Sequence, residues 1–288
     1  MEPSKTQQVG SPAVASNASA RLSGRYRRKL EVPRAVSAES LPQSSVRASF
    51  KARFSEMVLI NFEVAPRVLK KILPHGLEAD LYHGAAHLCL VVKKVQRLRK
   101  FGVPVSPPFG SLSLQLYVKE ATPAGDRFGT LRLKHYVQGA LPAWVLGKLT
   151  QGEISVLPMK LSAKKQPRDR PPVLEYKWKI GDAWNHIRVR GRSRVKNLQS
   201  EKMAYVLRHV DRYVHSGRQV YRSEIETPQW VIWDVAQAKF DCDVKQLFGQ
   251  EFVKPMSGRP ASVFVSRGKE VSISKPIPVI PGVREIML

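Results

Sequence analysis

Alternation of apolar and polar residues with a period of two is the feature that most constrains what this chain can fold into. Successive side chains of a strand point to opposite faces of a sheet, so such segments predict antiparallel strands that each bury one face. The alternating segments are 112–118, 131–137, 174–180 and 187–189. Gly181-Asp182 lies between the last two and predicts a tight turn.

Further strands are expected where the chain is apolar without alternation. The runs 57–62 and 87–92 predict buried strands. Residues 262–265 and 271–273 predict a late hairpin around Arg267-Gly268. Strands therefore dominate the expected fold.

Helices are fewer and do not alternate with the strands. Pro66 begins a short helix that ends before Gly76, and residues 140–149 form a second one. Ser200 is a good N-cap for a third helix, whose apolar residues recur at helical spacing as far as Val214. The sequence therefore predicts a mainly β (α+β) fold, an antiparallel β-barrel-like core with a few packed helices.

The first 50 residues differ in composition from the rest. They hold ten Ser, eight Lys+Arg and three Glu, with a basic cluster at 25–29. This composition predicts a disordered basic tail, followed by a single domain over 51–288. A transit peptide for an organelle and an arm that touches nucleic acid are the alternatives to a solvated tail without a specific partner.

Charge and cysteine content narrow the class of protein. The chain has 288 residues, 48 Lys+Arg against 23 Asp+Glu and a formal net charge of +25, which favours polyanions and small anions as partners. Cys89 and Cys242 are too few for a disulfide scaffold, and the longest uncharged apolar stretch, 140–147, is too short for a membrane span of ~20 residues. We expect a cytoplasmic protein, or an organelle protein if the tail is a transit peptide, without membrane contact. The sequence leaves the oligomeric state open.

Motifs for cofactors and metals are absent from the sequence. There is no glycine-rich phosphate loop, no dinucleotide fingerprint, no nucleophile elbow and no HExxH. His83, His87 and Cys89 are close together, but Gly84 interrupts them, so we expect satisfied or exposed histidines. The sequence predicts no cofactor and no metal.

Lys160 is the candidate catalytic residue. It lies between the apolar residues Met159 and Leu161, with Lys164 and Lys165 nearby. Partial desolvation and neighbouring cations would lower the pKa of its amine and free a nucleophile. The alternative is an ordinary exposed lysine at the start of a basic loop over 160–170.

The strongest basic zone, 160–196, contains four arginines at alternate positions, Arg188, Arg190, Arg192 and Arg194. On a strand they project from one face. On an outer face they would form a polyanion-binding patch. At the mouth of a barrel, one or two of them would clamp a carboxylate.

The order of several segments resembles the YqjF-like family, domain-of-unknown-function family 2071, in the acetoacetate decarboxylase-like superfamily. The matching pieces are 65–69 with 73–78, the strand 112–118 ending in Tyr117-Val118, Leu157-Pro158 with Ala163, a helix over 205–213 that carries Arg212-Tyr213, and 227–230. The resemblance covers about residues 53–248. It implies a single acetoacetate decarboxylase-like domain with a central cavity for a small acid.

The resemblance also bears on mechanism. Acetoacetate decarboxylases carry a Schiff-base lysine and a neighbouring lysine in a Pro-Lys-Lys-Leu-Ala segment, whereas this chain has Met159 in the first position and Lys160 in the second. Methionine cannot form an imine, so the decarboxylase mechanism does not carry over directly.

Two functions follow from these observations. The first is binding of a small organic acid, with Lys160 and one of Arg188 or Arg190 as anion contacts and Tyr117 and Trp230 as cavity walls; catalysis stays open. The alternative is a basic module that binds nucleic acid or another polyanion through the tail and the strip 188–194.

Overall fold

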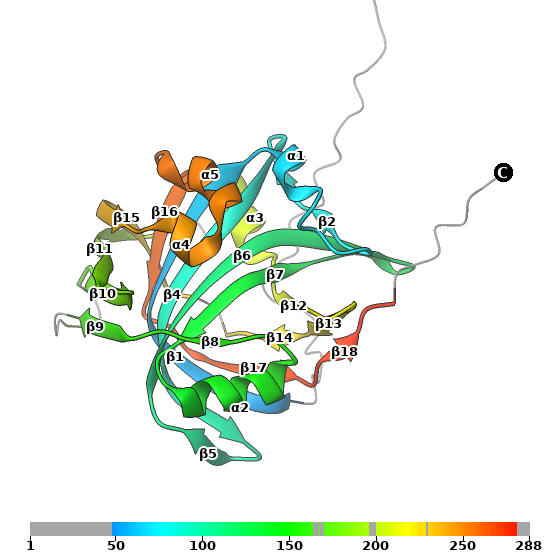
Figure 1. Cartoon of the computed structure of the whole chain (residues 1–288), viewed down its shortest axis with the longest axis horizontal. Helices are drawn as coiled ribbons and strands as arrows, with labels where there is room; N and C mark the ends of the chain where they lie inside the picture. Colours follow the sequence, from blue (N-terminus) through cyan, green and yellow to red (C-terminus); the bar gives the residue numbers. More distant parts are fainter. Residues whose placement is uncertain (1–47, 164–166, 168–169, 196–199, 229, 281–288) are drawn as a thin grey trace, which may run out of the picture. The chain divides into compact units, whose positions relative to one another are not determined.

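The computed structural model describes residues 48–163, 167, 170–195, 200–228 and 230–280 (Figure 1). The chain separates into the units Met1–Pro42 and Gln43–Leu288, and the second holds all the described residues. Most of the predicted tail, including its basic cluster 25–29, lies outside the described residues. The first strand begins at Ala48, slightly before the expected domain start at residue 51.

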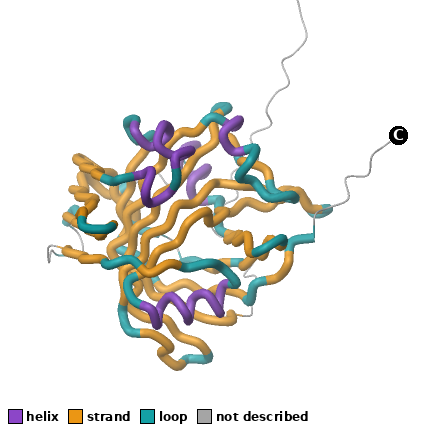
Figure 2. Tube along the Cα trace, viewed as in Figure 1, coloured by secondary structure: helices purple, strands orange, loops and turns teal. Residues whose placement is uncertain are grey.

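Strands make up most of the described fold, as predicted (Figure 2). They are β1 (Ala48–Val64), β2 (Glu78–Ala79), β3 (Leu81–Tyr82), β4 (Ala85–Lys100), β5 (Val103–Ser106), β6 (Phe109–Thr122), β7 (Gly125–Val137), β8 (Ser155–Val156), β9 (Met159–Ala163), β10 (Val173–Ile180), β11 (Ala183–Arg194), β12 (Asp211–Ser216), β13 (Gln219–Ser223), β14 (Ile225–Glu226), β15 (Ile232–Asp241), β16 (Ser262–Ser266), β17 (Glu270–Ser274) and β18 (Ile277–Pro278). The helices are α1 (Pro66–Leu69), α2 (Ala140–Thr150), α3 (Glu201–Leu207), α4 (Val244–Phe248), the 3₁₀ helix η1 (Gln250–Phe252) and α5 (Val253–Ser257).

The four longest strands form the centre of one curved sheet. β1 pairs antiparallel with β4, β4 with β6, and β6 with β7. Beyond β7 the sheet continues through β12, which runs parallel to β7, and then through β13 and β18. On its other side β1 pairs with β16, which leads to β15, β11, β10 and β9. Segments far apart in the sequence therefore meet along β1.

The expected barrel is corrected by the strand pairing, because the sheet is not closed. β18 pairs with β13, and β14 pairs with β17. β14 follows β13 after Glu224, and its pairing with β17 covers only two residue pairs, with one further backbone bond from Ser274 N to Glu224 O at 3.0 Å. Strands of two residues, such as β14 and β18, are too short to carry a ladder around the remaining gap. The fold is mainly β with a strongly curved, open sheet.

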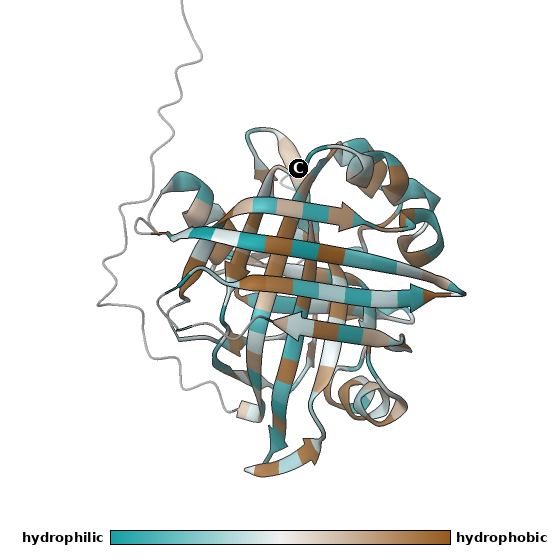
Figure 3. Ribbon diagram, turned by 90° about the vertical axis from the view of Figure 1, so that its left-hand side faces the viewer, coloured by the Kyte–Doolittle hydropathy of each residue, from teal (hydrophilic) through white to brown (hydrophobic). Residues whose placement is uncertain are grey.

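The two faces of the long strands have different neighbours, and apolar and polar residues alternate along them (Figure 3). One face carries fully buried leucines, Leu88, Leu90, Leu112, Leu114 and Leu116. The segment from α4 to α5 adds Phe248, Phe252 and Met256 to the same core. Burying a leucine stabilises the fold by about 1.5–3 kcal/mol, so this face holds the sheet together. The opposite, concave face carries the polar residues described below.

The helix α3 ends sooner than predicted, and the chain continues as a strand. The helix ends at Leu207, and Val214, expected on the helix, lies on β12. Arg212 and Tyr213, which the family resemblance placed at the end of a helix, also lie on β12. Ser200 precedes α3 as expected, but its side chain makes no capping hydrogen bond.

The side chains that follow α3 explain this early end. Arg208 Nε donates to Asp80 Oδ2 at 3.0 Å, and His209 Nε2 lies 2.8 Å from the same oxygen. These bonds tie the chain to the start of β3, from where it continues as a strand. A distant carboxylate thus decides the helix length, which local periodicity does not encode.

The expected hairpin over 262–273 is also corrected. β16 and β17 each pair with β1, along different halves of that strand. The register of β1 against β4 shifts between Ser55 and Val58, so the two halves of β1 are offset and take different partners. The other predicted hairpin, β10–β11, is confirmed, with Gly181 at a φ of 54° in its turn. In the described part of the chain, no helix is long and apolar enough to cross a membrane.

Candidate functional site

Two connected chambers lie on the concave face of the sheet. The outer chamber has a volume of about 130 Å³ and is lined mainly by apolar side chains from β1, β4, α3 and the 225–232 segment. The inner chamber has a volume of about 30 Å³ and is lined by Ser111, Ser113, Arg132 and His135, among others. Phe54, Lys93, Gln115 and Arg212 line both chambers and mark the boundary between them.

Strand geometry places the polar residues of β4 and β6 in this space. Lys93 follows Cys89 and Val91 at alternate positions on β4, and all three line the outer chamber. On β6, Ser113, Gln115 and Tyr117 alternate with the buried leucines and face the chambers. Polar residues that alternation would place in solvent are buried here inside the curved sheet.

A β-bulge brings two further polar side chains of β7 into the inner chamber. Leu114 pairs with Lys134 and Gln115 with Arg132, so Leu133 is an extra residue in β7. The bulge reverses the alternation at this point, and His135 and Arg132 both line the inner chamber. Without it, residues three apart would face opposite sides of the sheet.

Arg212 reaches the boundary of the chambers because β12 runs close to β7. Arg212 is opposite Thr130 in this parallel pairing, and Asp211 is opposite Gly129. A Cβ atom at Gly129 would lie 2.4 Å from the Asp211 carbonyl oxygen. The glycine therefore permits the strand contact that positions Arg212.

Three cationic side chains meet at the chambers without an acidic partner. Lys93, Arg132 and Arg212 make no ion pair with any described residue, and no described Asp or Glu lines either chamber. The Lys93 ammonium group lies 3.8 Å from the centre of the Phe54 ring. A cation on an aromatic face is attracted to it, but the ring does not neutralise the charge. These three side chains therefore make the site strongly positive.

This environment changes the titration of Lys93. Burial lowers the pKa of Lys93 well below its ordinary value, and the charges of Arg212 and Arg132 lower it further. Burial also lowers the pKa of Arg212, to about 10, so this guanidinium still carries its charge at neutral pH. Lys93 is thus the cation of the group that most readily gives up its proton and exposes a nucleophilic amine.

The histidine of the inner chamber is neutral. Burial lowers the pKa of His135 well below its ordinary value, and the three neighbouring cations act in the same direction. His135 Nε2 lies 2.9 Å from Ser111 Oγ, and Gln115 Nε2 donates to Ser113 Oγ at 2.8 Å. These uncharged groups add hydrogen-bonding capacity beside Arg132 and no negative charge.

The wall of the outer chamber includes Tyr117 and His209, whose rings stack with centroids 4.3 Å apart. The Tyr117 hydroxyl donates to Asn61 Oδ1 at 2.9 Å. Burial alone would raise the pKa of Asp80, but hydrogen bonds from His209 and Arg208 outweigh burial and lower it. Burial raises the pKa of Cys89 to about 12, so this thiol is protonated at neutral pH and is a poor nucleophile.

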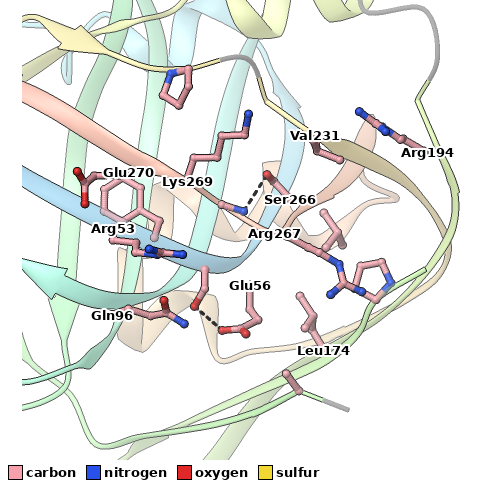
Figure 4. A pocket seen from close by; sticks show the side chains of 17 residues that line it. Arg53, Glu56, Gln96, Leu174, Arg194, Val231, Ser266, Arg267, Lys269 and Glu270 are labelled. Carbon is pink, nitrogen blue, oxygen red and sulfur yellow. Dashed lines mark hydrogen bonds between the residues drawn. The ribbon is translucent and has the colours of Figure 1, made fainter. Parts of the chain in front are cut away.

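Two other pockets lie outside the chambers. The one shown in Figure 4 has a volume of about 680 Å³ and includes Arg53, Glu56, Arg267 and Glu270. Its charges are of both signs, and Arg267 donates to the carbonyl oxygens of Pro167 and Arg170. A second pocket, which we call the β11 groove, is lined by Arg188, Arg190, Arg192, Lys239 and others.

Of the residues predicted from the sequence, the structure brings two to the chambers. Tyr117 and Trp230 both line the outer chamber, where cavity walls were expected. Arg188 and Arg190 are exposed on β11 and line the β11 groove instead. Lys160 is exposed on β9, with its ammonium group 4.8 Å from the Trp184 ring centre, and it lines neither chamber. Its neighbours Lys164 and Lys165 lie outside the described residues.

Sequence reasoning missed the cationic group Lys93, Arg132 and Arg212. A signal for Lys93 was available, because it continues the alternating positions of Cys89 and Val91 beyond the predicted end of that strand. No signal existed for Arg132, whose orientation depends on a bulge. Among the described residues, no group of three or more His, Cys, Asp or Glu side chains is placed to hold a metal ion.

The fold belongs with the acetoacetate decarboxylase-like structures. An acetoacetate decarboxylase from Legionella pneumophila matches with a TM-score of 0.59 and 12% identity, over 81% of this chain and 87% of that one. The enduracididine biosynthesis enzyme MppR complexed with pyruvate matches with a TM-score of 0.58 and 13% identity, over 84% and 97%. An acetoacetate decarboxylase-like enzyme from Sphingomonas wittichii RW1 matches with a TM-score of 0.58 and 9% identity, over 81% and 93%.

The sequence itself identifies the family. Residues 51–270 match DUF2071, a family of uncharacterized conserved proteins, and the chain belongs to this family. No curated protein matches the sequence. The expected family is confirmed, and the fold is like that of the acetoacetate decarboxylase-like structures.

Proposed function

We propose that this protein binds a small organic acid in the two chambers, with a carboxylate held between Lys93 and Arg212. The observation that carries the proposal is the meeting of three cationic side chains in a space that no described Asp or Glu lines. An isolated buried charge is costly, and a bound carboxylate would neutralise it and accept charge-assisted hydrogen bonds. The site thus stores an unfavourable charge that a ligand relieves.

Cavity size limits the ligand to a few carbon atoms. The outer chamber, at about 130 Å³, is near the volume of an engineered cavity of about 150 Å³ that holds benzene. Trp230, Met57 and Ile232 give it apolar walls against which a short carbon chain would pack. Val210 also lines this chamber and is 46% exposed, so this part of the wall lies at the protein surface.

The structural relatives suggest the first probe. One of them is described as complexed with pyruvate, and others as acetoacetate decarboxylases. Both names point to short carboxylic acids with a keto group. Pyruvate is therefore a suitable first ligand for this chain, although identities of 9–13% relate the folds alone.

A keto acid would also give the Lys93 amine a reaction partner. In its unprotonated form the amine can add to the carbonyl carbon; a carbon–nitrogen bond forms, the carbonyl oxygen leaves as water, and an imine remains. In this proposal Lys93, rather than Lys160, supplies the amine. Catalysis beyond this step is not part of the proposal.

Calorimetric titration of the full chain with pyruvate tests the proposal. Lys93→Met keeps the length and apolar stem of the side chain and removes its amine. We expect it to weaken pyruvate binding by at least tenfold, on the order of one charge-assisted hydrogen bond. Lys160→Met is the matched control and should bind as the wild type does. Unchanged affinity of Lys93→Met, or loss of binding in Lys160→Met, would contradict the assignment.

The second candidate function rests on the exposed face of β11. Arg188, Arg190, Arg192 and Arg194 are all exposed there, and no described acidic residue is paired with them. Such a strip can neutralise the phosphates or sulfates of a polyanion. Heparin or DNA binding that weakens steeply with salt, and that is lost when Arg188 and Arg190 become Ser, would support this alternative. Binding without salt dependence would exclude it.

A further inference from the structure

The strongest observation that the proposed function leaves unexplained is the number of uncompensated charges. One carboxylate would need one cation, or two in a bidentate clamp. The chambers have three, and Arg132 lines the inner chamber only, beyond the boundary where Lys93 and Arg212 lie. A ligand with a single acid group at the boundary would leave Arg132 without a partner.

Two other arginines of this chain, the largely buried Arg222 and the exposed Arg208, donate to carboxylates. Arg222 donates to Glu120 Oε2 at 2.8 Å, and Arg208 donates to Asp80. In contrast, Nε and Nη1 of Arg132 and Nε of Arg212 are buried without a hydrogen-bond partner among the described residues. Burial and the charge of Arg212 lower the pKa of Arg132 well below its ordinary value, and burial lowers the pKa of Arg212 to about 10. Guanidinium groups nevertheless keep their proton in proteins, so we assign a positive charge to both arginines.

The remaining groups of the site do not balance these charges. His135 is neutral, Ser111, Ser113 and Gln115 are uncharged, and Tyr117 keeps its proton because burial raises its pKa well above the ordinary value. Lys93 can reduce the charge by releasing its own proton. Two positive charges then remain, one at the boundary and one in the inner chamber.

From this balance we infer that the preferred ligand is a small dicarboxylate, with one acid group between Lys93 and Arg212 and the other in the inner chamber at Arg132. The inference rests on the proposed function and specifies its ligand class. Two separated arginines on different strands match two acid groups joined by a short chain better than they match one compact ion. The inner chamber, at about 30 Å³, has room for about two waters, so little more than a carboxylate fits there.

Butyrate and succinate form a matched pair of probes, since both have four carbons and differ in the number of acid groups. We expect succinate to bind the full chain at pH 7 at least tenfold more tightly than butyrate. Arg132→Met should remove most of the preference for succinate over butyrate. Lys160 is exposed and lines neither chamber, so Lys160→Met serves as the control and should preserve the succinate preference.

The outcomes separate this inference from the proposed function. Equal affinity for butyrate and succinate would overturn the dicarboxylate inference and leave the proposed function standing. Absence of binding by butyrate, succinate and pyruvate would overturn both. Inorganic phosphate, tested alone, would overturn the dicarboxylate assignment if it bound more tightly than succinate. The comparison in the wild type decides the matter even if Arg132→Met does not fold.

Discussion

At the scale of single residues, the central feature is a lysine that the fold keeps in an unfavourable place. Lys93 is 7% exposed, lies beside two arginines and has no carboxylate within the described structure to neutralise it. Buried, unpaired charges destabilise a fold unless a ligand compensates them. Such local cost is common where a residue serves function rather than stability.

Because the pKa of Lys93 is lowered, the destabilisation by its buried charge should depend on pH. Its pKa in the folded chain is lowered well below its value of about 10.4 in an unfolded chain. Between these two values the unfolded chain binds more protons, so the contribution of Lys93 to the free energy of unfolding rises with pH. Without ligand, Lys93→Met should be more stable than the wild type by about 1–2 kcal/mol at pH 7.

The higher stability of Lys93→Met should shrink as the pH is raised toward 9. This range stays below the Arg212 pKa of about 10, so Arg212 remains charged throughout. Chemical denaturation of both proteins at pH 7, 8 and 9 measures the difference in stability, and Lys160→Met provides the control at an exposed lysine. A wild type that is more stable than Lys93→Met at pH 7 would show that Lys93 has a stabilising partner, contrary to this account.

The positions of the residues that line the chambers were only partly predictable from the sequence. Tyr117 and Trp230 were expected as cavity walls and do line the outer chamber. Lys93 was not identified, because a lysine at the end of an apolar run usually marks the point where a strand reaches solvent. Its burial depends on the curvature of the whole sheet, which no local pattern carries.

At the scale of elements, the site depends on two departures from regular strand geometry. The bulge at Leu133 turns Arg132 toward the inner chamber, and the close parallel contact of β7 with β12 positions Arg212. Without the bulge, Arg132 and His135 would face opposite sides of the sheet, since a shift of one residue reverses the faces of a strand.

Gly129→Ala tests the second of these features, the close contact between β7 and β12. The new Cβ would lie 2.4 Å from the carbonyl oxygen of Asp211, so β12 must move away from β7. We expect a loss of about 1–3 kcal/mol in the free energy of unfolding, together with weaker binding of small acids because Arg212 moves. Thermal unfolding and calorimetric titration measure the two effects.

Gly258→Ala is the matched control, because no atom lies within 4 Å of a Cβ at that position. It should change the free energy of unfolding by no more than about 0.5 kcal/mol. A Gly129→Ala protein with unchanged stability and unchanged binding would show that the β7–β12 contact is not required for the site.

Strands were the most predictable elements. Alternation located β6, β7, β10 and β11, because one face of each strand meets an apolar core. Alternation does not show whether the polar face of a strand is solvent-exposed, and on β6 Ser113 and Gln115 are buried. The end of α3 was missed because its cause, the carboxylate of Asp80, is more than a hundred residues away in the chain.

At the scale of the whole molecule, fold and family were predictable and closure of the sheet was not. The order of segments carried the family resemblance, and the match over residues 51–270 confirms it. Whether a curved sheet closes depends on its last strands, and those strands, β14 and β18, have two residues each. Two residues are too few to show any period in the sequence.

Net charge is a second property of the whole molecule, and the function that it suggests depends on where the charged residues lie. The formal charge of +25 suggested polyanions. Three of these cations lie at the chambers, while Arg188 and Arg190 are exposed at the β11 groove. The small-acid proposal thus rests on the buried cations, and the polyanion alternative on the exposed ones.

A crystal structure of the full chain grown with succinate tests the central claim most directly. The account predicts succinate in the chambers, with one carboxylate within hydrogen-bonding distance of Lys93 Nζ and the Arg212 guanidinium and the other beside Arg132. Chambers that hold only water at saturating succinate, with the acid bound at Arg188 and Arg190 of the β11 groove, would contradict it.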